Sequence, residues 1–356
     1  MLFALSDVFR SILLPRATAR TFRLGPLLGA TFGPPWAFVA DRIADQRRRQ
    51  AFRGALAPLL LVISLLTWIA LLILGFGLLM SAARHRFDPA LTGYGDAFYQ
   101  AASSFLTLGL SGVTAAGSAR IVTVLAGLAG LATVTIVASF LLSVQSALHR
   151  REVLVLGLAA AAGRPPSGLA ILESYARLAS PSELAQLFKA WQDWAADVLH
   201  SHRAYPILAE FRSTDEDDEW LASLSAVLDA AVLLLAAVDD REAKPAQSAA
   251  RLFLPIGCRT AHDLARQFAV KRKDSPDPSF LREEFRVARR RLAAASYQLA
   301  ADERAGYETL LRLREGHAGA MAGLAHHLGI AITPGLLPAG EPPPEVVRED
   351  PRKAAE

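Results

Sequence analysis

Two long runs without a charged residue constrain this chain more than any other feature of its sequence. Leu56–Met80 has 25 residues and Ile121–Leu148 has 28, and neither contains Asp, Glu, Lys or Arg. A transmembrane helix needs about 20 apolar residues, and helices of soluble proteins rarely run past about 20 residues without a polar face. We therefore predict that both runs are transmembrane helices.

The basic residues around the two runs predict an orientation. Arg47–Arg49 and Arg53 precede the first run, and Arg150–Arg151 follow the second. The segment between the runs carries three arginines that two aspartates partly offset. Because Lys and Arg concentrate on the cytoplasmic side, both termini are predicted to be cytoplasmic. The stretch Leu24–Ala40 is uncharged but contains Pro26, Gly33, Pro34 and Pro35, which disfavour one straight helix. We expect it to lie in the membrane interface.

The segment between the runs contains a second uncharged stretch that is too short to span. No charged residue occurs from Ala97 to Ser118. Ala97–Leu106 is compatible with a half-length helix of about 16 Å, and Thr107–Gly112 then supplies a Thr- and Gly-containing turn. Irregular backbone at membrane depth occurs only inside protein or along a water-filled path. This pattern predicts a re-entrant pore loop, whose helix C-terminus and backbone carbonyls favour a cation. The alternative is an extracellular loop with an amphipathic surface helix.

The order of span, half-helix, turn and span resembles the pore module of the potassium channel superfamily. The filter of that family reads Thr-Val/Leu-Gly-Tyr/Phe-Gly-Asp. The matching positions here are Thr107, Leu108, Gly109, Leu110, Ser111 and Gly112. Segments outside the pore, such as DVFRSILLPR, RREV and SHRAYPILAEFRS, resemble a bacterial group of two-span channels with a helical cytoplasmic tail.

The resemblance implies roles for individual residues. The carbonyls of Thr107–Leu110, with the Thr107 hydroxyl and the neighbouring Ser111, are expected to line the ion sites. The second span is expected to line an inner cavity, with Gly127 or Gly130 as a gating hinge. Four chains are expected to surround one axis, because a single loop cannot encircle an ion.

Two positions depart from the family pattern. Leu110 replaces an aromatic residue, and Ser111 replaces a glycine that adopts a left-handed conformation in the family. A non-glycine residue in that conformation costs about 1–2 kcal/mol. Gly112 is able to take the turn one residue later. These departures favour an alternative function, in which the protein is a non-conducting, membrane-anchored interaction or signalling protein with a decayed pore loop.

The rest of the chain is predicted to be a helical cytoplasmic bundle. Gly157 lies in an Ala-rich stretch that favours helix, so no nucleotide-binding domain is expected. Val227–Val238 is too short to span the membrane and carries Asp229, which predicts a core helix of the bundle. The expected bundle helices are 166–179, 182–204, 218–238, 246–268, 279–301 and 303–328. The expected domains are an N-terminal interfacial segment (1–50), a two-span pore domain (51–150), the helical domain (151–333) and a disordered tail (334–356).

The sequence lacks the usual signs of several other functions. A net charge of +4 and scattered arginines do not indicate nucleic-acid binding, and one cysteine excludes an intrachain disulfide. The chain shows no nucleophile–base set or metal-ligand spacing, so we expect no enzyme activity, no cofactor and no metal beyond a permeant cation. The fold class predicted is an all-α membrane protein with two transmembrane helices, a re-entrant pore helix and a cytoplasmic helical bundle. With the resemblance, it suggests a homotetrameric monovalent-cation channel, with potassium as the expected ion, in the lipid of a bacterial inner membrane.

Overall fold

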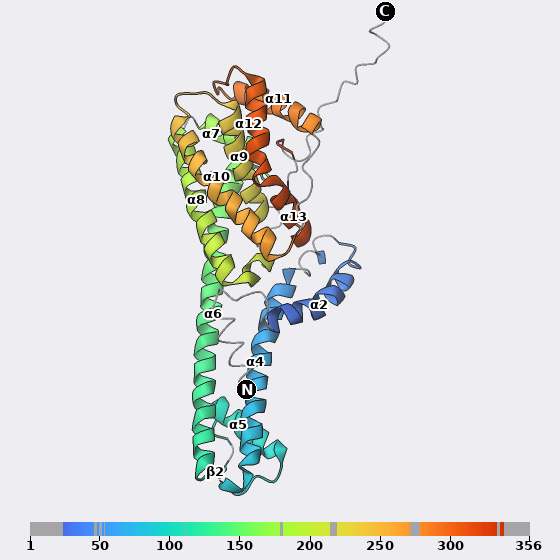
Figure 1. Cartoon of the computed structure of the whole chain (residues 1–356), viewed down its shortest axis with the longest axis vertical. Helices are drawn as coiled ribbons and strands as arrows, with labels where there is room; N and C mark the ends of the chain where they lie inside the picture. Colours follow the sequence, from blue (N-terminus) through green and yellow to red (C-terminus); the bar gives the residue numbers. More distant parts are fainter. Residues whose placement is uncertain are drawn as a thin grey trace, which may run out of the picture. The chain divides into compact units, whose positions relative to one another are not determined.

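The structure is a computed structural model, and it describes residues 24–45, 48–49, 52, 54–110, 112–178, 181–213, 219–270, 278–332 and 335–337. The described chain is mainly helical (Figure 1). It divides into two compact units, one formed by 1–146 with 203–211 and the other by 147–202 with 212–356. We call these the pore unit and the bundle unit.

The pore unit contains two long apolar helices with a short excursion between them. Helix α4 covers Leu56–Ala82, and α6 covers Ser118–Ala162, its first 29 residues lying in this unit. Between them come η2 (Arg84–Arg86), β1 (Phe87–Asp88), α5 (Tyr94–Phe105) and β2 (Thr114–Ala115). Most large apolar side chains of α6 within this unit are exposed, whereas those of α4 divide between a buried stripe and an exposed face; exposed apolar faces of this kind are typical of helices that contact lipid.

Two short strands hold the ends of the excursion together. β1 and β2 pair antiparallel, with Phe87 opposite Ala115 and Asp88 opposite Thr114. The amide of Ala116 also donates to the carbonyl of Arg86 at 2.8 Å. The chain between the strands therefore leaves one end of α4 and returns to the same place before α6 begins.

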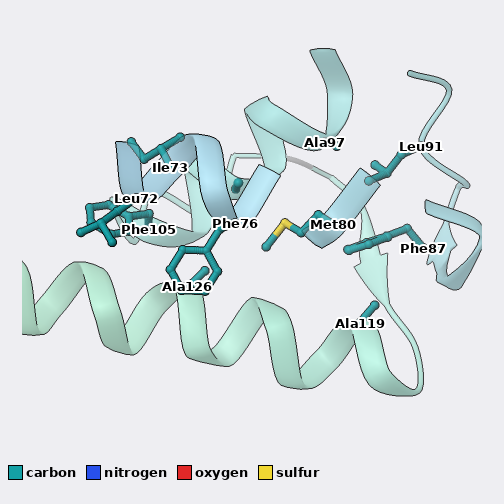
Figure 2. Packing of buried hydrophobic residues seen from close by; sticks show 11 residues of the cluster. Leu72, Ile73, Phe76, Met80, Phe87, Leu91, Ala97, Phe105, Ala119 and Ala126 are labelled. Carbon is teal, nitrogen blue, oxygen red and sulfur yellow. The ribbon is translucent and has the colours of Figure 1, made fainter. Parts of the chain in front are cut away.

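The core of the pore unit joins α4, α5 and α6 (Figure 2). Ala97, Ala101 and Phe105 recur every four residues and so form one buried face of α5. This face packs with one stripe of α4 and with the start of α6, and the cluster consists of Leu72, Ile73, Phe76, Met80, Phe87, Leu91, Ala97, Ala101, Phe105, Ala119 and Ala126.

Helix α2 (Leu24–Ala40) packs on α4 in the same unit. The backbone stays helical through Pro34 and Pro35, so these prolines do not end the helix. The indole Nε1 of Trp36 donates to the carbonyl of Phe52 at 2.9 Å, and the two rings stack with centroids 4.2 Å apart. These contacts attach α2 just before α4 begins.

Residues 203–211 also belong to the pore unit, although the sequence placed them within the helical domain. This segment includes η3 (Pro206–Glu210). Ile207 and Phe211 pack against a cluster that contains Leu61, Leu65, Trp68, Ile136, Val137 and Phe140. The ring of Tyr205 meets that of Phe140 edge-on, with centroids 5.5 Å apart.

The bundle unit surrounds the apolar helix α9 (Trp220–Ala237). Its other helices are the end of α6, α7 (Gly168–Arg177), α8 (Pro181–Ala204), α10 (Lys244–Gln267), α11 (Pro278–Ala294), α12 (Glu303–Glu315) and α13 (Ala318–Leu328). α9 is long and apolar enough to cross a membrane, yet 94% of its residues are buried inside the unit. The prediction that it is a core helix is confirmed.

Two helix predictions in this unit need correction. The single helix expected over residues 303–328 is two helices, because the chain turns at Gly316 and His317, where the imidazole Nε2 lies 3.3 Å from the carboxylate of Asp229. The helix expected over 279–301 ends at Ala294, because Leu299 forms a backbone bridge with Val238.

Gly335–Leu337 lie at the start of the predicted disordered tail but are buried against the bundle. The amide of Leu336 donates to the carboxylate of Glu284 at 2.8 Å, and Arg314 donates to the carbonyl of Gly335 at 3.2 Å. The remainder of the predicted tail lies outside the described residues.

Candidate functional site

The candidate site is the loop that follows α5. Three of its amides donate back to the last turn of α5: Leu106 to Ala102 at 2.9 Å, Thr107 to Ser104 at 3.1 Å, and Leu108 to Ser103 at 2.8 Å. These hydrogen bonds pair carbonyls that the end of a helix otherwise leaves without a partner, and they fix the point at which the chain leaves the helix.

The backbone of the loop alternates in handedness. Thr107 has φ +56° and Gly109 has φ +66°, whereas Leu108 and Leu110 do not have a positive φ. Such alternation turns successive N–H groups to one side of the chain and therefore successive C=O groups to the other. A loop with such a backbone is able to present a row of carbonyl oxygens, which is an arrangement suited to a cation.

Thr107 is the strained residue of this loop. A β-branched residue with positive φ is an outlier, and it costs about 1–2 kcal/mol. Its hydroxyl donates to the carbonyl of Leu106 at 2.7 Å, so the hydroxyl oxygen keeps lone pairs for a further interaction. Gly112 takes a left-handed conformation with φ +58°, as expected from the sequence. Ser111, the fifth predicted filter residue, lies outside the described residues.

The loop exposes apolar side chains in a single chain. The exposed fractions of Leu106, Leu108 and Leu110 are 44%, 54% and 64%. Three neighbouring leucines on an irregular loop are unfavourable in water, so this surface indicates contact with lipid or with other protein.

Ser103 attaches the loop to α5 through its side chain. The amide of Leu110 donates to the hydroxyl oxygen of Ser103 at 3.0 Å, seven residues back in the chain. Gln100 lies one turn earlier and is also buried, and its Oε1 has no hydrogen-bond partner within the described part of the chain. Neither residue was predicted from the sequence, because only the fold of the loop brings Leu110 beside Ser103.

The two predicted hinge glycines lie where α6 crosses the end of α5. A Cβ on Gly130 would overlap the carbonyl oxygen of Phe105, and a Cβ on Gly127 would lie 3.5 Å from the carbonyl oxygen of Ser104. α6 continues through both positions as one helix. Gly130 therefore permits a direct backbone contact between α5 and α6, and its role as a hinge stays a prediction.

The other end of α5 carries an acid in its first turn. The carboxylate of Asp96 accepts from the amide of Thr92 at 3.0 Å and also from the Thr92 hydroxyl. The N-cap is Gly93, so α5 begins at Tyr94, three residues before the predicted start at Ala97, and Asp96 lies in its first turn. A carboxylate in the first turn is favourable near the positive end of the helix dipole.

The described residues contain no group of three or more His, Cys, Asp or Glu side chains placed to hold a metal ion. The basic side chains of α11 are engaged in structural contacts. Arg291 forms a bidentate pair with Glu173 at 2.6 and 2.7 Å, and Arg289 donates to the carbonyl of Ala300 at 2.7 Å.

A comparison with known families agrees with the geometry of the pore unit. Residues 64–146 match the family model described as "Ion channel". No curated protein and no solved structure matches the chain. The match includes α5, its loop and most of the two apolar helices, which supports an ion channel family and, with those helices, a membrane protein.

Proposed function

We propose that this chain is one subunit of a homotetrameric channel for monovalent cations, with potassium as the preferred ion. The membrane is the bacterial inner membrane, and both termini are cytoplasmic. Ions pass along the backbone carbonyls of Thr107–Leu110, together with Ser111. The bundle unit assembles or gates the pore.

The observation that carries the proposal is the depth at which α5 ends. The carbonyl of Phe105 lies against Gly130, which is nine residues inside the charge-free run that begins at Ile121. At 1.5 Å per residue this is about 14 Å, or roughly half of a hydrocarbon core of about 30 Å. β1 and β2 hold the two ends of the excursion together, which supports a loop that enters and leaves from one side of the membrane.

The end of α5 favours a positive charge. Its last carbonyls give this end a partial negative charge, and the loop continues that end with carbonyls along one side. Within the described residues 97–110 and 112–118 no side chain carries a charge that would compete for the ion. Because one loop supplies only one side of an ion site, the site requires several copies around an axis.

Conductance of the purified full chain in a planar bilayer tests the proposal. Under gradients of potassium, sodium and an impermeant organic cation, we expect a reversal potential that follows potassium. Gly109→Ala is expected to reduce the current strongly, because alanine is strained at φ +66°. Gly95→Ala is the matched control, since both glycines have open space at Cβ and only Gly109 has a positive φ.

A folded tetramer that passes neither cation would contradict the proposal. It would favour the non-conducting interaction or signalling protein, for which the departures at Leu110 and Ser111 are the supporting observation.

A further inference from the structure

Among the hydrogen bonds of the described residues, Ser103 is the one residue of α5 that binds the loop through both its backbone and its side chain. Its carbonyl accepts from the amide of Leu108 at 2.8 Å, and its hydroxyl accepts from the amide of Leu110 at 3.0 Å. The residue is 3% exposed, so these bonds are shielded from water.

Each bond fixes the direction of a whole peptide unit. A trans peptide is planar, and its N–H and C=O point in opposite directions. The amide of Leu108 shares its peptide plane with the carbonyl of Thr107, and the amide of Leu110 shares its plane with the carbonyl of Gly109. Because both amides point to Ser103, both carbonyls point away from α5.

The two peptide units differ in how they are held. Backbone alone holds the Leu108 amide, so any residue at position 103 preserves that bond. The Leu110 amide depends on a side-chain oxygen. Gly109, on the other side of that peptide bond, has a freer backbone than the leucines that flank it. The carbonyl of Gly109 is therefore the one whose direction a single side chain controls.

We propose that Ser103 is a positioning residue for ion selectivity, which aims the carbonyl of Gly109 at the ion path. This inference rests on the proposed function. Leu110 stands where the family has an aromatic residue. In the described part of the chain, the side-chain hydrogen bond that holds this part of the loop is the one at the Ser103 hydroxyl.

The test compares Ser103→Ala with Ser104→Ala in the full chain. The two serines are adjacent on α5, but the described side-chain hydrogen bond between α5 and the loop is the one that the Ser103 hydroxyl accepts. We expect Ser103→Ala to lower the potassium-to-sodium permeability ratio by at least about tenfold, since a tetramer loses this hydrogen bond in each of its four subunits. Ser104→Ala is expected to leave the ratio within about twofold of the wild type, and Ser103→Thr, which keeps the hydroxyl, is expected to retain most of it.

A second readout does not require conduction. We expect amide hydrogen exchange of Leu110 to become about fivefold faster in Ser103→Ala, as loss of a bond of about 1 kcal/mol implies, and to stay unchanged in Ser104→Ala. Leu108 serves as an internal reference, because its amide keeps its backbone acceptor.

The outcomes separate this inference from the proposed function. If the wild type conducts and Ser103→Ala changes neither selectivity nor Leu110 exchange, the role of Ser103 is overturned while the channel stands. If Leu110 exchange rises but the selectivity of a conducting channel does not change, Ser103 holds the loop without setting selectivity, which also overturns the inference. A wild type that does not conduct contradicts the proposed function, whatever the exchange shows.

Discussion

Helices α6 and α9 have similar apolar composition, but their surroundings differ. Both are long and apolar enough to cross a membrane. Only 17% of the residues in the apolar part of α6 are buried, against 94% in α9. α9 also carries Asp229 in its middle, whereas the charge-free run of α6 leaves its outer face to leucine, isoleucine and valine.

The difference shows that composition alone does not separate a transmembrane helix from the core of a bundle. What separates them is the environment that covers the apolar surface. α9 is covered by other helices of the bundle unit and buries one charge with its partners. α6 leaves its apolar surface uncovered in the single chain, and lipid or other copies must cover it.

The largest expected effect concerns the buried charge of α9. Arg314 donates to Asp229 at 3.0 Å, and both are nearly fully buried. Burial alone would raise the pKa of Asp229, but the charge of Arg314 and the hydrogen bond from His317 outweigh it and lower that pKa. Arg314→Met leaves the carboxylate without its main partner, so we expect a loss of about 3–5 kcal/mol in the free energy of unfolding of the bundle unit.

Chemical denaturation of the full chain in detergent measures this loss. Arg304→Met is the control, since its pair with Glu308 is exposed, and it should cost at most about 0.5 kcal/mol. The double change Asp229→Leu with Arg314→Met should recover most of the loss. Equal effects of the two arginine changes would mean that α9 does not depend on a buried pair.

The second prediction concerns the contact of α6 with α5. Gly130→Ala places a methyl group on the carbonyl of Phe105, so the two helices must separate and the pore unit should lose about 3 kcal/mol. Gly127→Ala is the matched control on the same helix, because its Cβ makes an ordinary contact of 3.5 Å. Thermal unfolding of the detergent-solubilised protein provides the comparison. If alanine were tolerated equally at both positions, α5 would not end against α6.

The smallest effect concerns the pH dependence of the bundle. His202 is buried beside Trp220, with ring centroids 5.6 Å apart, and it bonds to Ser201. Burial, and secondly the charge of Arg151, lower the pKa of His202 to about 3. The unfolded chain, with a pKa near 6.5, binds one more proton between about pH 6.5 and pH 3, so stability falls as pH falls through this range.

The expected slope from this one group is up to about 1.4 kcal/mol per pH unit. Unfolding free energies at pH 6.5, 5.5 and 4.5 measure it. His202→Gln should reduce the slope, whereas His200→Gln, which changes an exposed neighbour, should not. An unchanged slope in His202→Gln would show that this imidazole is not held neutral in the fold.

Much of the fold was predictable from charge and apolar pattern. The two charge-free runs predicted α4 and α6, and Asp229 within a short apolar run predicted α9 as a core helix. The predicted start of α5 was three residues too late. Glycines such as Gly93 and Gly95 are typical of a turn, but in the structure the helix continues through Gly95.

The details of the candidate site were less predictable. The Thr107–Gly112 turn was visible in the sequence because its residue types favour irregular backbone. Ser103 and the contact at Gly130 were not, since each depends on two segments that only the tertiary fold brings together. The positive φ of Thr107 was also missed, because a β-branched residue is not expected in that conformation.

Cation-dependent heat stability of the full-length protein tests most directly whether the loop binds a monovalent cation. An ion that binds only the folded protein raises its stability, by about 2.7 kcal/mol when its concentration is one hundred times its Kd. We predict a higher Tm in potassium than in an impermeant organic cation, and loss of this difference in Gly109→Ala but not in Gly95→Ala. The same Tm in both salts for the wild type would contradict the account.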